Sequence, residues 1–286
     1  MSEIDSDGDD DGIETTGYSC MNAGLSGDED FSIDLFGQKL KLIQVPRNVA
    51  IGHGAVVWEA SVLFAKYIEF GQDKNLSNAK LLDKTVLELG CGPGLAGISM
   101  MMKGSKVVLT DLVDVVDVVA RSNVTKIFGA LTSQGSGAFS DLHAPGVCAL
   151  DWTNANGVAE IATAVTTVGG GESESSEVKT SESSSISGSS SGSSAPPPYD
   201  YVIACDCVFT ESLIPDFVRT IRDACGPRSI VYVAHEIRDE DANNLFLRIL
   251  REDFTVKSIP TAKQHPDFIH PLVQLVMAKP KRGGRQ

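Results

Sequence analysis

The sequence predicts an α/β fold: a Rossmann-like, seven-stranded, doubly wound sheet that is mostly parallel with one antiparallel strand. Short apolar runs typical of buried parallel strands alternate with stretches of helical periodicity. The first of these runs leads directly into a glycine-rich turn that opens a helix. The last two runs, at residues 254–259 and 272–278, have no helical pattern between them and are expected to close the sheet as an antiparallel pair.

The stretch 86–97, VLELGCGPGLAG, is the centre of this fold. Its first four residues form an apolar run with one acid, typical of a buried strand. From Leu95 the apolar spacing is helical. The turn between strand and helix lets a ligand approach the backbone closely, because its glycines carry no Cβ. The residues expected to contact a cofactor here are Gly90, Cys91, Gly92 and Gly94.

The identity of that cofactor depends on two acids. Residues 92–97 also satisfy the dinucleotide pattern G-x-G-x-x-G. Glu88 argues against a dinucleotide, because a carboxylate repels a pyrophosphate and attracts the sulfonium and amino groups of S-adenosylmethionine. Asp111 ends the second strand, 106–111, and is placed to accept hydrogen bonds from ribose hydroxyls of either cofactor. S-adenosylmethionine is favoured, and a nicotinamide dehydrogenase is a distant alternative.

The remaining elements follow in order along the chain. Residues 31–45 alternate around Gly37-Gln38 and predict a hairpin. Residues 54–61 lead into an amphipathic helix that continues to residue 68; Trp58 stands at its start, and the helix is expected to cover the sheet. Further helices are predicted at 113–128, 214–225 and 239–251, and further strands at 147–150, 199–206 and 229–235.

Charge and composition set the domain organisation. Of the net charge of −14, residues 1–30 contribute −10 and residues 169–198 contribute −3, so the rest is nearly neutral and carries no nucleic-acid footprint. We expect a disordered acidic tail (1–30), one domain (31–280) with a disordered serine-rich insertion (169–198), and a basic tail (281–286). Six cysteines without metal-ligand spacing indicate buried thiols in a reducing compartment and no metal. With no membrane-length apolar run, the expected location is the cytoplasm, with the nucleus as a second compartment.

A set of motifs, in this order, carries a family resemblance: VVWEAS, VLELGCGPGLAG, LTD, LDW and ACDCVF. Together they resemble the seven-stranded, class I methyltransferases of family 16, which methylate lysines in non-histone proteins. The likeness covers residues 31–279 apart from the serine-rich insertion. It is strongest toward the branch with the valosin-containing-protein and Hsp70 lysine methyltransferases, and HEIR with IPTAKQHPDF favours the former.

The resemblance implies roles for further residues. Trp58 would contact the methionine end of the cofactor, Trp152 and Asp151 its adenine, and Cys205 would present backbone to it; Leu112, after Asp111, belongs to the same site. Each role has a structural alternative. For the two tryptophans it is packing in the core or in a loop, and for Asp111 it is capping a strand end.

Two residues are the catalytic candidates. Asp206 and Phe209 stand where the family commonly carries D-x-x-Y, so the tyrosine hydroxyl is absent here. Methyl transfer to an amine requires positioning and loss of the ammonium proton. An apolar channel lowers the pKa of a lysine, and Asp206 is placed to hold or take the proton. The alternative for Asp206 is fixing the loop after its strand.

The resemblance therefore implies a monomeric protein-lysine N-methyltransferase that uses S-adenosylmethionine. Its partner would be a protein substrate of chaperone, AAA ATPase or elongation-factor type. A small-molecule methyltransferase is one alternative, because fold does not determine substrate. An inactive methyltransferase-like domain that binds partners is another, motivated by Phe209 and the long polar segments.

Overall fold

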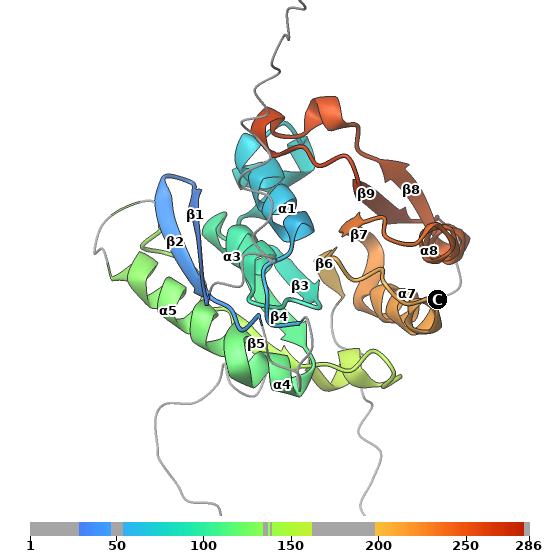
Figure 1. The fold of residues 1–286 in the computed structure, drawn as a ribbon, viewed down its shortest axis with the longest axis horizontal. Helices are drawn as coiled ribbons and strands as arrows, with labels where there is room; N and C mark the ends of the chain where they lie inside the picture. The colour runs from blue at the N-terminus through green and yellow to red at the C-terminus, as the bar shows by residue number, and fades with distance from the viewer. Residues whose placement is uncertain (1–28, 47–53, 134–136, 138, 162–197, 283–286) are drawn as a thin grey trace, which may run out of the picture.

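The computed structural model describes residues 29–46, 54–133, 137, 139–161 and 198–282. Residues 1–28 of the predicted acidic tail and 169–197 of the predicted serine-rich insertion lie outside the described residues, whereas Asp30, the last residue of that tail, begins a strand. Within them the chain forms a seven-stranded sheet with helices on both faces, and a separate two-stranded hairpin beside one helix layer (Figure 1). The predicted α/β fold is confirmed. In this part of the chain, no helix combines the length and the apolar character needed to cross a membrane.

The seven strands confirm the predicted topology. Their order across the sheet is β5-β4-β3-β6-β7-β9-β8. The first five in this order pair in parallel, and β9 runs antiparallel to both of its neighbours. Their bounds are β3 Thr85–Leu89, β4 Lys106–Asp111, β5 Gly146–Ala149, β6 Tyr199–Cys205, β7 Cys225–Glu236, β8 Phe254–Ser258 and β9 Val273–Pro280.

The helices form two layers, because alternate residues of each strand face opposite sides of the sheet. Val86 and Tyr201 belong to the apolar core under α1, α3 and α5, whereas Leu87 and Val202 belong to the core under α7 and α8. The helices are α1 Glu59–Phe70, α2 Asn78–Leu81, α3 Leu95–Met102, α4 Val113–Val115, α5 Arg121–Thr132, α7 Ile214–Ala224 and α8 Glu240–Asp253.

The predicted hairpin is formed by β1 (Asp30–Leu35) and β2 (Gln38–Ile43). Phe36 and Gly37 make its turn in the left-handed region, with φ of 51° and 75°. Asn123 of α5 holds the hairpin to the domain: its side chain donates to the carbonyl of Ile43 and accepts from the N–H of Ile43, both at 2.8 Å.

The predicted helix at 113–128 differs from the observed one in two ways. A π-helical turn over Val116–Ala120 separates α4 from α5, and α5 continues to Thr132. The π turn places one more residue in the turn than an α-helix does, and it buries Val116, Val119 and Ala120 together.

A hydrogen-bonded network ties α1 to the sheet, although the sequence showed no pattern for it. The Asp73 carboxylate accepts the hydroxyl of Tyr67 from α1 at 3.0 Å and that of Tyr232 from β7 at 2.6 Å. The backbone N–H of Asn75 donates to the same carboxylate at 2.8 Å. Tyr201 donates to the Asn75 carbonyl at 2.7 Å.

The topology brings the site residues to one edge of the sheet. The carboxyl ends of the five parallel strands meet there, and β9, being antiparallel, starts there opposite Glu236. The chain runs from β3 outward to β4 and β5 and then returns to β6 on the other side of β3. A ligand crevice is expected at this reversal, between the ends of β3 and β6.

Candidate active site

The glycine turn after β3 has a backbone that other residues adopt only under strain. Gly90, Gly92 and Gly94 have φ of 64°, 52° and 95°, all in the left-handed region. A Cβ on Gly90 would lie 2.6 Å from the Cys207 sulfur and 3.3 Å from the Trp152 ring. The turn is therefore closely packed as well as left-handed, and Gly94 is the N-cap of α3.

Asp111 lies at the end of β4, beside this turn. Its two carboxylate oxygens accept the N–H groups of Gly92 and Leu112, each at 2.8 Å. Burial raises the pKa of Asp111 to about 6, although these two donors lower it. Each oxygen retains capacity for a further hydrogen bond, as a ribose diol requires. The Leu112 side chain, 54% exposed, is open at the same edge.

Glu88 is buried beneath α3, and its predicted contact with the cofactor stays a prediction. Its side chain is only 1% exposed and accepts the N–H of Gly97 at 2.9 Å beneath α3. A Cβ on Gly97 would lie 2.3 Å from the Glu88 carboxylate. Burial raises the pKa of Glu88 well above its usual range. The electrostatic argument that used Glu88 to reject a dinucleotide therefore has no support in the structure.

Trp152 follows β5 and lies against the glycine turn. Its ring packs 4.8 Å from that of Phe217 on α7, centroid to centroid, and its carbonyl accepts from Arg219. With the ring 3.3 Å from the position of a Cβ on Gly90, Trp152 packs directly against the glycine turn. Its predicted contact with adenine stays a prediction.

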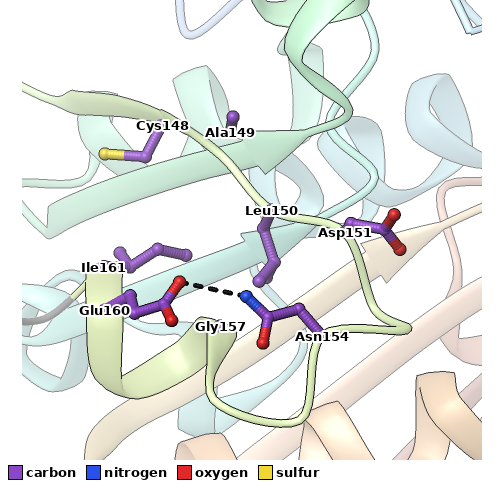
Figure 2. Close-up of a pocket in the computed structure, with 8 residues that line it drawn as sticks. All are labelled: Cys148, Ala149, Leu150, Asp151, Asn154, Gly157, Glu160 and Ile161. Atoms are coloured by element: carbon purple, nitrogen blue, oxygen red, sulfur yellow. Dashed lines mark hydrogen bonds between the residues drawn. The ribbon is translucent and has the colours of Figure 1, made fainter.

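Asp151 is exposed and lies on a hollow beside β5. One of its oxygens accepts the backbone N–H and the hydroxyl of Thr153, both at 2.8 Å, and these bonds lower its pKa. Figure 2 shows the hollow between the loop after β5 and residues 157–161. Its volume is about 270 Å³. Residues 157–161 are helical, which the sequence did not predict. Asn154 donates to Glu160 across the hollow at 3.0 Å. None of the glycines of the turn lines the hollow, so it is distinct from the crevice.

Three cysteines surround the turn as neutral thiols. Cys91 and Cys207 are buried, and the Cys207 thiol donates to the carbonyls of Leu89 at 3.3 Å and Cys205 at 3.4 Å. Burial raises the pKa of all three thiols well above the usual range. They act as packing groups here, and the carbonyl of Cys205 is already engaged by Cys207.

Asp206, the first catalytic candidate, is buried at the end of β6 in a strained conformation. Its φ is 57°, unusual for a residue other than glycine, and its side chain is 3% exposed. Its carboxylate accepts the N–H of Glu236 at 3.0 Å and pairs with Arg238 at 3.3 Å. Burial raises the pKa of Asp206, and the Glu236 N–H and the Arg238 guanidinium offset part of the increase.

Arg238 links Trp58 to the Asp206 carboxylate by contacting both. As predicted, Trp58 stands at the start of α1, where it is the N-cap. The Arg238 guanidinium lies 4.6 Å from the centroid of the Trp58 ring. Arg238 also pairs with Glu236, with Nη2 2.7 Å from the carboxylate. Glu59, the next residue of α1, is buried, and burial followed by the charges of Asp206 and Glu236 raises its pKa.

The sequence did not single out Glu59, and it predicted no contact between Arg238 and Trp58. Glu59 stands in WEAS directly after Trp58, and Arg238 stands in HEIR at the end of a predicted strand, so both were in view. Phe209, the second catalytic candidate, is 52% exposed, so its ring encloses no channel here and lies at the surface three residues after Asp206. Among the described residues, no group of His, Cys, Asp and Glu side chains is arranged to hold a metal.

The crevice fits S-adenosylmethionine. Asp111 offers two oxygens to a diol, the left-handed glycines let a ligand reach backbone, and Trp152 and Leu112 supply an aromatic wall and an exposed apolar side chain for an adenine. The fold and the crevice define a class I, S-adenosylmethionine-dependent methyltransferase.

The comparison with protein families identifies the chain further. A family model described as lysine methyltransferase matches residues 37–134 and 188–253, more than half of the chain. The chain belongs to this lysine methyltransferase family, which the motifs predicted.

Individual relatives are more distant. The chain is 27% identical over 205 residues to "EEF1A lysine methyltransferase 3" of Mus musculus, covering 71% of this chain and 65% of the relative, just under two thirds of its length. It is 25% identical to the protein of the same name in Xenopus tropicalis, covering 79% and 77%. It is 22% identical to "Protein N-lysine methyltransferase METTL21A" of Xenopus tropicalis, covering 73% and 72%. The narrower resemblance to the valosin-containing-protein branch stays a prediction.

A solved structure has the same fold. The T. thermophilus 16S rRNA N2 G1207 methyltransferase (RsmC), in complex with AdoMet and guanosine, aligns with a TM-score of 0.50. The alignment covers 88% of this chain and 50% of that one, at 13% identity. At this identity the match concerns the fold alone.

Proposed function

We propose that this chain transfers the methyl group of S-adenosylmethionine to a lysine side-chain amine of a protein. One observation supports this most: the buried carboxylate of Asp206 lies at the end of β6 with the acids Glu59 and Glu236 near it, and Arg238 links it to the Trp58 ring. Carboxylates attract an ammonium, and the Arg238 guanidinium already lies over the Trp58 ring, so the acids are the groups that would receive the substrate amine. Membership of the lysine methyltransferase family supports the same reaction.

The bound cofactor supplies a methyl group on a positively charged sulfur, which a neutral amine attacks in line. The task of the chain's own residues is to bring a lysine there and relieve it of a proton. Burial of the lysine stem lowers the pKa of its ammonium. Asp206 accepts a hydrogen bond from that ammonium, and because burial raises the pKa of Asp206, it is a better proton acceptor than an exposed aspartate.

A protein substrate is supported by the exposed side chains around this edge. Phe209 follows Asp206, and Ile269 and Leu272 precede β9 at the same edge, all with exposed apolar side chains. These residues would pack against the segment that carries the lysine. Two relatives are named for lysine methylation of EEF1A, which makes EEF1A the first candidate substrate, with chaperones and AAA ATPases as further candidates. The enzyme would act as a monomer in the cytoplasm, with the nucleus as a second compartment.

The test has two stages. Isothermal titration of the whole chain with S-adenosylmethionine should give a micromolar dissociation constant, and Asp111→Ala should abolish binding. Purified EEF1A and an extract are then incubated with the enzyme and radiolabelled S-adenosylmethionine, and methylated lysines are located by mass spectrometry. Asp206→Asn, which keeps the shape of the side chain, is expected to bind the cofactor normally and to lose transfer.

The outcomes separate the alternative functions. Cofactor binding with no transfer to any protein, but with transfer to small molecules of the same extract, would replace the protein substrate by a small molecule. Cofactor binding without any turnover would support a partner-binding role. A folded wild-type protein that binds no S-adenosylmethionine would refute the enzyme proposal altogether.

A further inference from the structure

We propose that Arg238 is a positioning residue of the transfer site, which clamps the Trp58 ring and the Asp206 carboxylate in the arrangement that receives the substrate amine. This inference rests on the proposed function. Arg238 lies just beyond β7, and the three groups that it joins come from three elements: the start of α1, the end of β6 and the end of β7.

Arg238 contacts both the ring and the carboxylates. Its guanidinium carbon lies over the Trp58 ring, 4.6 Å from the ring centroid. One nitrogen, Nη2, lies 3.3 Å from Asp206 and 2.7 Å from Glu236, and Nε donates to Glu236 at 2.8 Å. A guanidinium stacks on an aromatic ring and binds carboxylates at once because it is planar and delocalised. A lysine supplies the charge without the plane.

The strain at Asp206 explains why a clamp is useful there. A non-glycine residue at φ 57° is held by its surroundings and not by its own preference. Its N–H donates to the Ala234 carbonyl at 2.8 Å, which fixes the backbone. The side chain is fixed by the Glu236 N–H on one oxygen and by Arg238 on the other. Without Arg238 one oxygen loses its partner and the carboxylate gains freedom.

The charges around Asp206 give the clamp a second role. Glu59 faces it from α1, and Glu236, His235 and Arg238 face it from β7 and the residues that follow. The thiols of Cys205 and Cys207 lie on its own segment, and His270 acts on Glu59. The guanidinium is the permanent positive charge among these groups and keeps Asp206 ionised to lower pH.

The role is one of positioning and not of general stability. The Arg238 side chain is about one third exposed, and ion pairs at such places contribute little to folding. Its partners are instead the residues predicted to hold the cofactor and the amine. Trp58 lies 180 residues before Arg238 in the chain, so their contact exists only in the folded site.

The test compares Arg238→Ala and Arg238→Lys with Arg222→Ala. Arg222 lies on α7, pairs with Asp223 and Asp253, and serves as the matched control. We expect Arg238→Ala to lower kcat at least tenfold while the dissociation constant for S-adenosylmethionine changes less than threefold. The acid limb of its pH–rate profile should move up by about one pH unit, because the loss of a neighbouring cation raises the pKa of Asp206 and of the substrate ammonium. Arg238→Lys should restore the acid limb but only part of kcat, and Arg222→Ala should match the wild type.

A second measurement needs no turnover. In a Trp152→Phe background Trp58 is the remaining tryptophan, so its emission reports on the stacked guanidinium. Arg238→Ala should change this emission, and Arg222→Ala should not. An unchanged emission, an unchanged acid limb, or an equal loss of kcat in Arg222→Ala would overturn the clamp. Absence of methyl transfer by the wild type, with the emission changed as expected, would instead refute the proposed function.

Discussion

Replacing Gly90 by alanine tests the packing of the glycine turn most directly. The new Cβ would lie 2.6 Å from the Cys207 sulfur, a distance that Cβ atoms do not tolerate, and 3.3 Å from the Trp152 ring. The residue also has φ of 64°. We estimate about 1–2 kcal/mol for an alanine in the left-handed region and about 1–3 kcal/mol for overpacking. The free energy of unfolding should therefore fall by about 2–5 kcal/mol.

Gly37→Ala provides the matched control. Gly37 has φ of 75°, close to that of Gly90, but a Cβ there would meet no atom within 4 Å. Urea unfolding of both variants should show the conformational contribution alone for Gly37→Ala, about 1–2 kcal/mol. Adding Cys207→Ala to Gly90→Ala removes the nearest clashing atom and should recover part of the loss. Titration with S-adenosylmethionine should show weaker binding for Gly90→Ala and none of this effect for Gly37→Ala.

The result that would refute this reasoning is equally specific. If Gly90→Ala is no more destabilised than Gly37→Ala and binds the cofactor as the wild type does, then Cys207 and Trp152 do not pack against Gly90 as described. Failure of Cys207→Ala to recover any stability would show that the sulfur contact is not the source of the loss.

Three further predictions concern titration and the Asp73 network. Because the pKa of Asp111 is raised to about 6, the ionised carboxylate is lost below that pH; the dissociation constant for S-adenosylmethionine should rise about tenfold per pH unit below 6, and a flat calorimetric profile would contradict it. Burial lowers the pKa of His235, so near pH 6.5 the unfolded chain binds a proton that the folded chain does not. The contribution of neutral His235 to the free energy of unfolding should be fully present above about pH 7, and below pH 6.5 it should fall by up to about 1.4 kcal/mol per pH unit. In urea titrations at several pH values, His235→Gln should reduce this slope. Tyr232→Phe removes a 2.6 Å hydrogen bond to the Asp73 carboxylate and should lower the free energy of unfolding by about 1.5–3 kcal/mol, against about 1 kcal/mol for Tyr201→Phe, whose acceptor is a neutral carbonyl; equal losses would argue against a charged Asp73.

The fold could be predicted because each strand carries its own signal. The runs at residues 86–89 and 106–111 are apolar, short and bounded by glycine or acid, and they became β3 and β4 with nearly the expected bounds. The π turn at Val116–Ala120 was not predictable, because the surplus of valines there fits an ordinary helix equally well until the packing is known.

The site was predictable where a residue follows a strand and not where a contact joins distant segments. Asp111 and Asp206 are strand-end acids, and the topology places them at one edge. Arg238 meets Trp58 only through the tertiary structure, which periodicity does not show. The burial of Glu88 could have been predicted. It lies two residues after Val86 in the strand and so shares the face of Val86, which is covered by the layer of α3, and Gly97 leaves room there for its carboxylate.

The place of β9 in the sheet has a consequence for synthesis. β8 precedes β9 in the chain, yet β9 lies between β7 and β8. A growing chain therefore exposes the edge of β7 after β8 has been made, and β8 has no partner in this sheet until Val273–Pro280 has emerged from the ribosome. An open strand edge is a site for mispairing with other chains. Nascent-chain chaperones should therefore matter most during synthesis of the last strands of this protein.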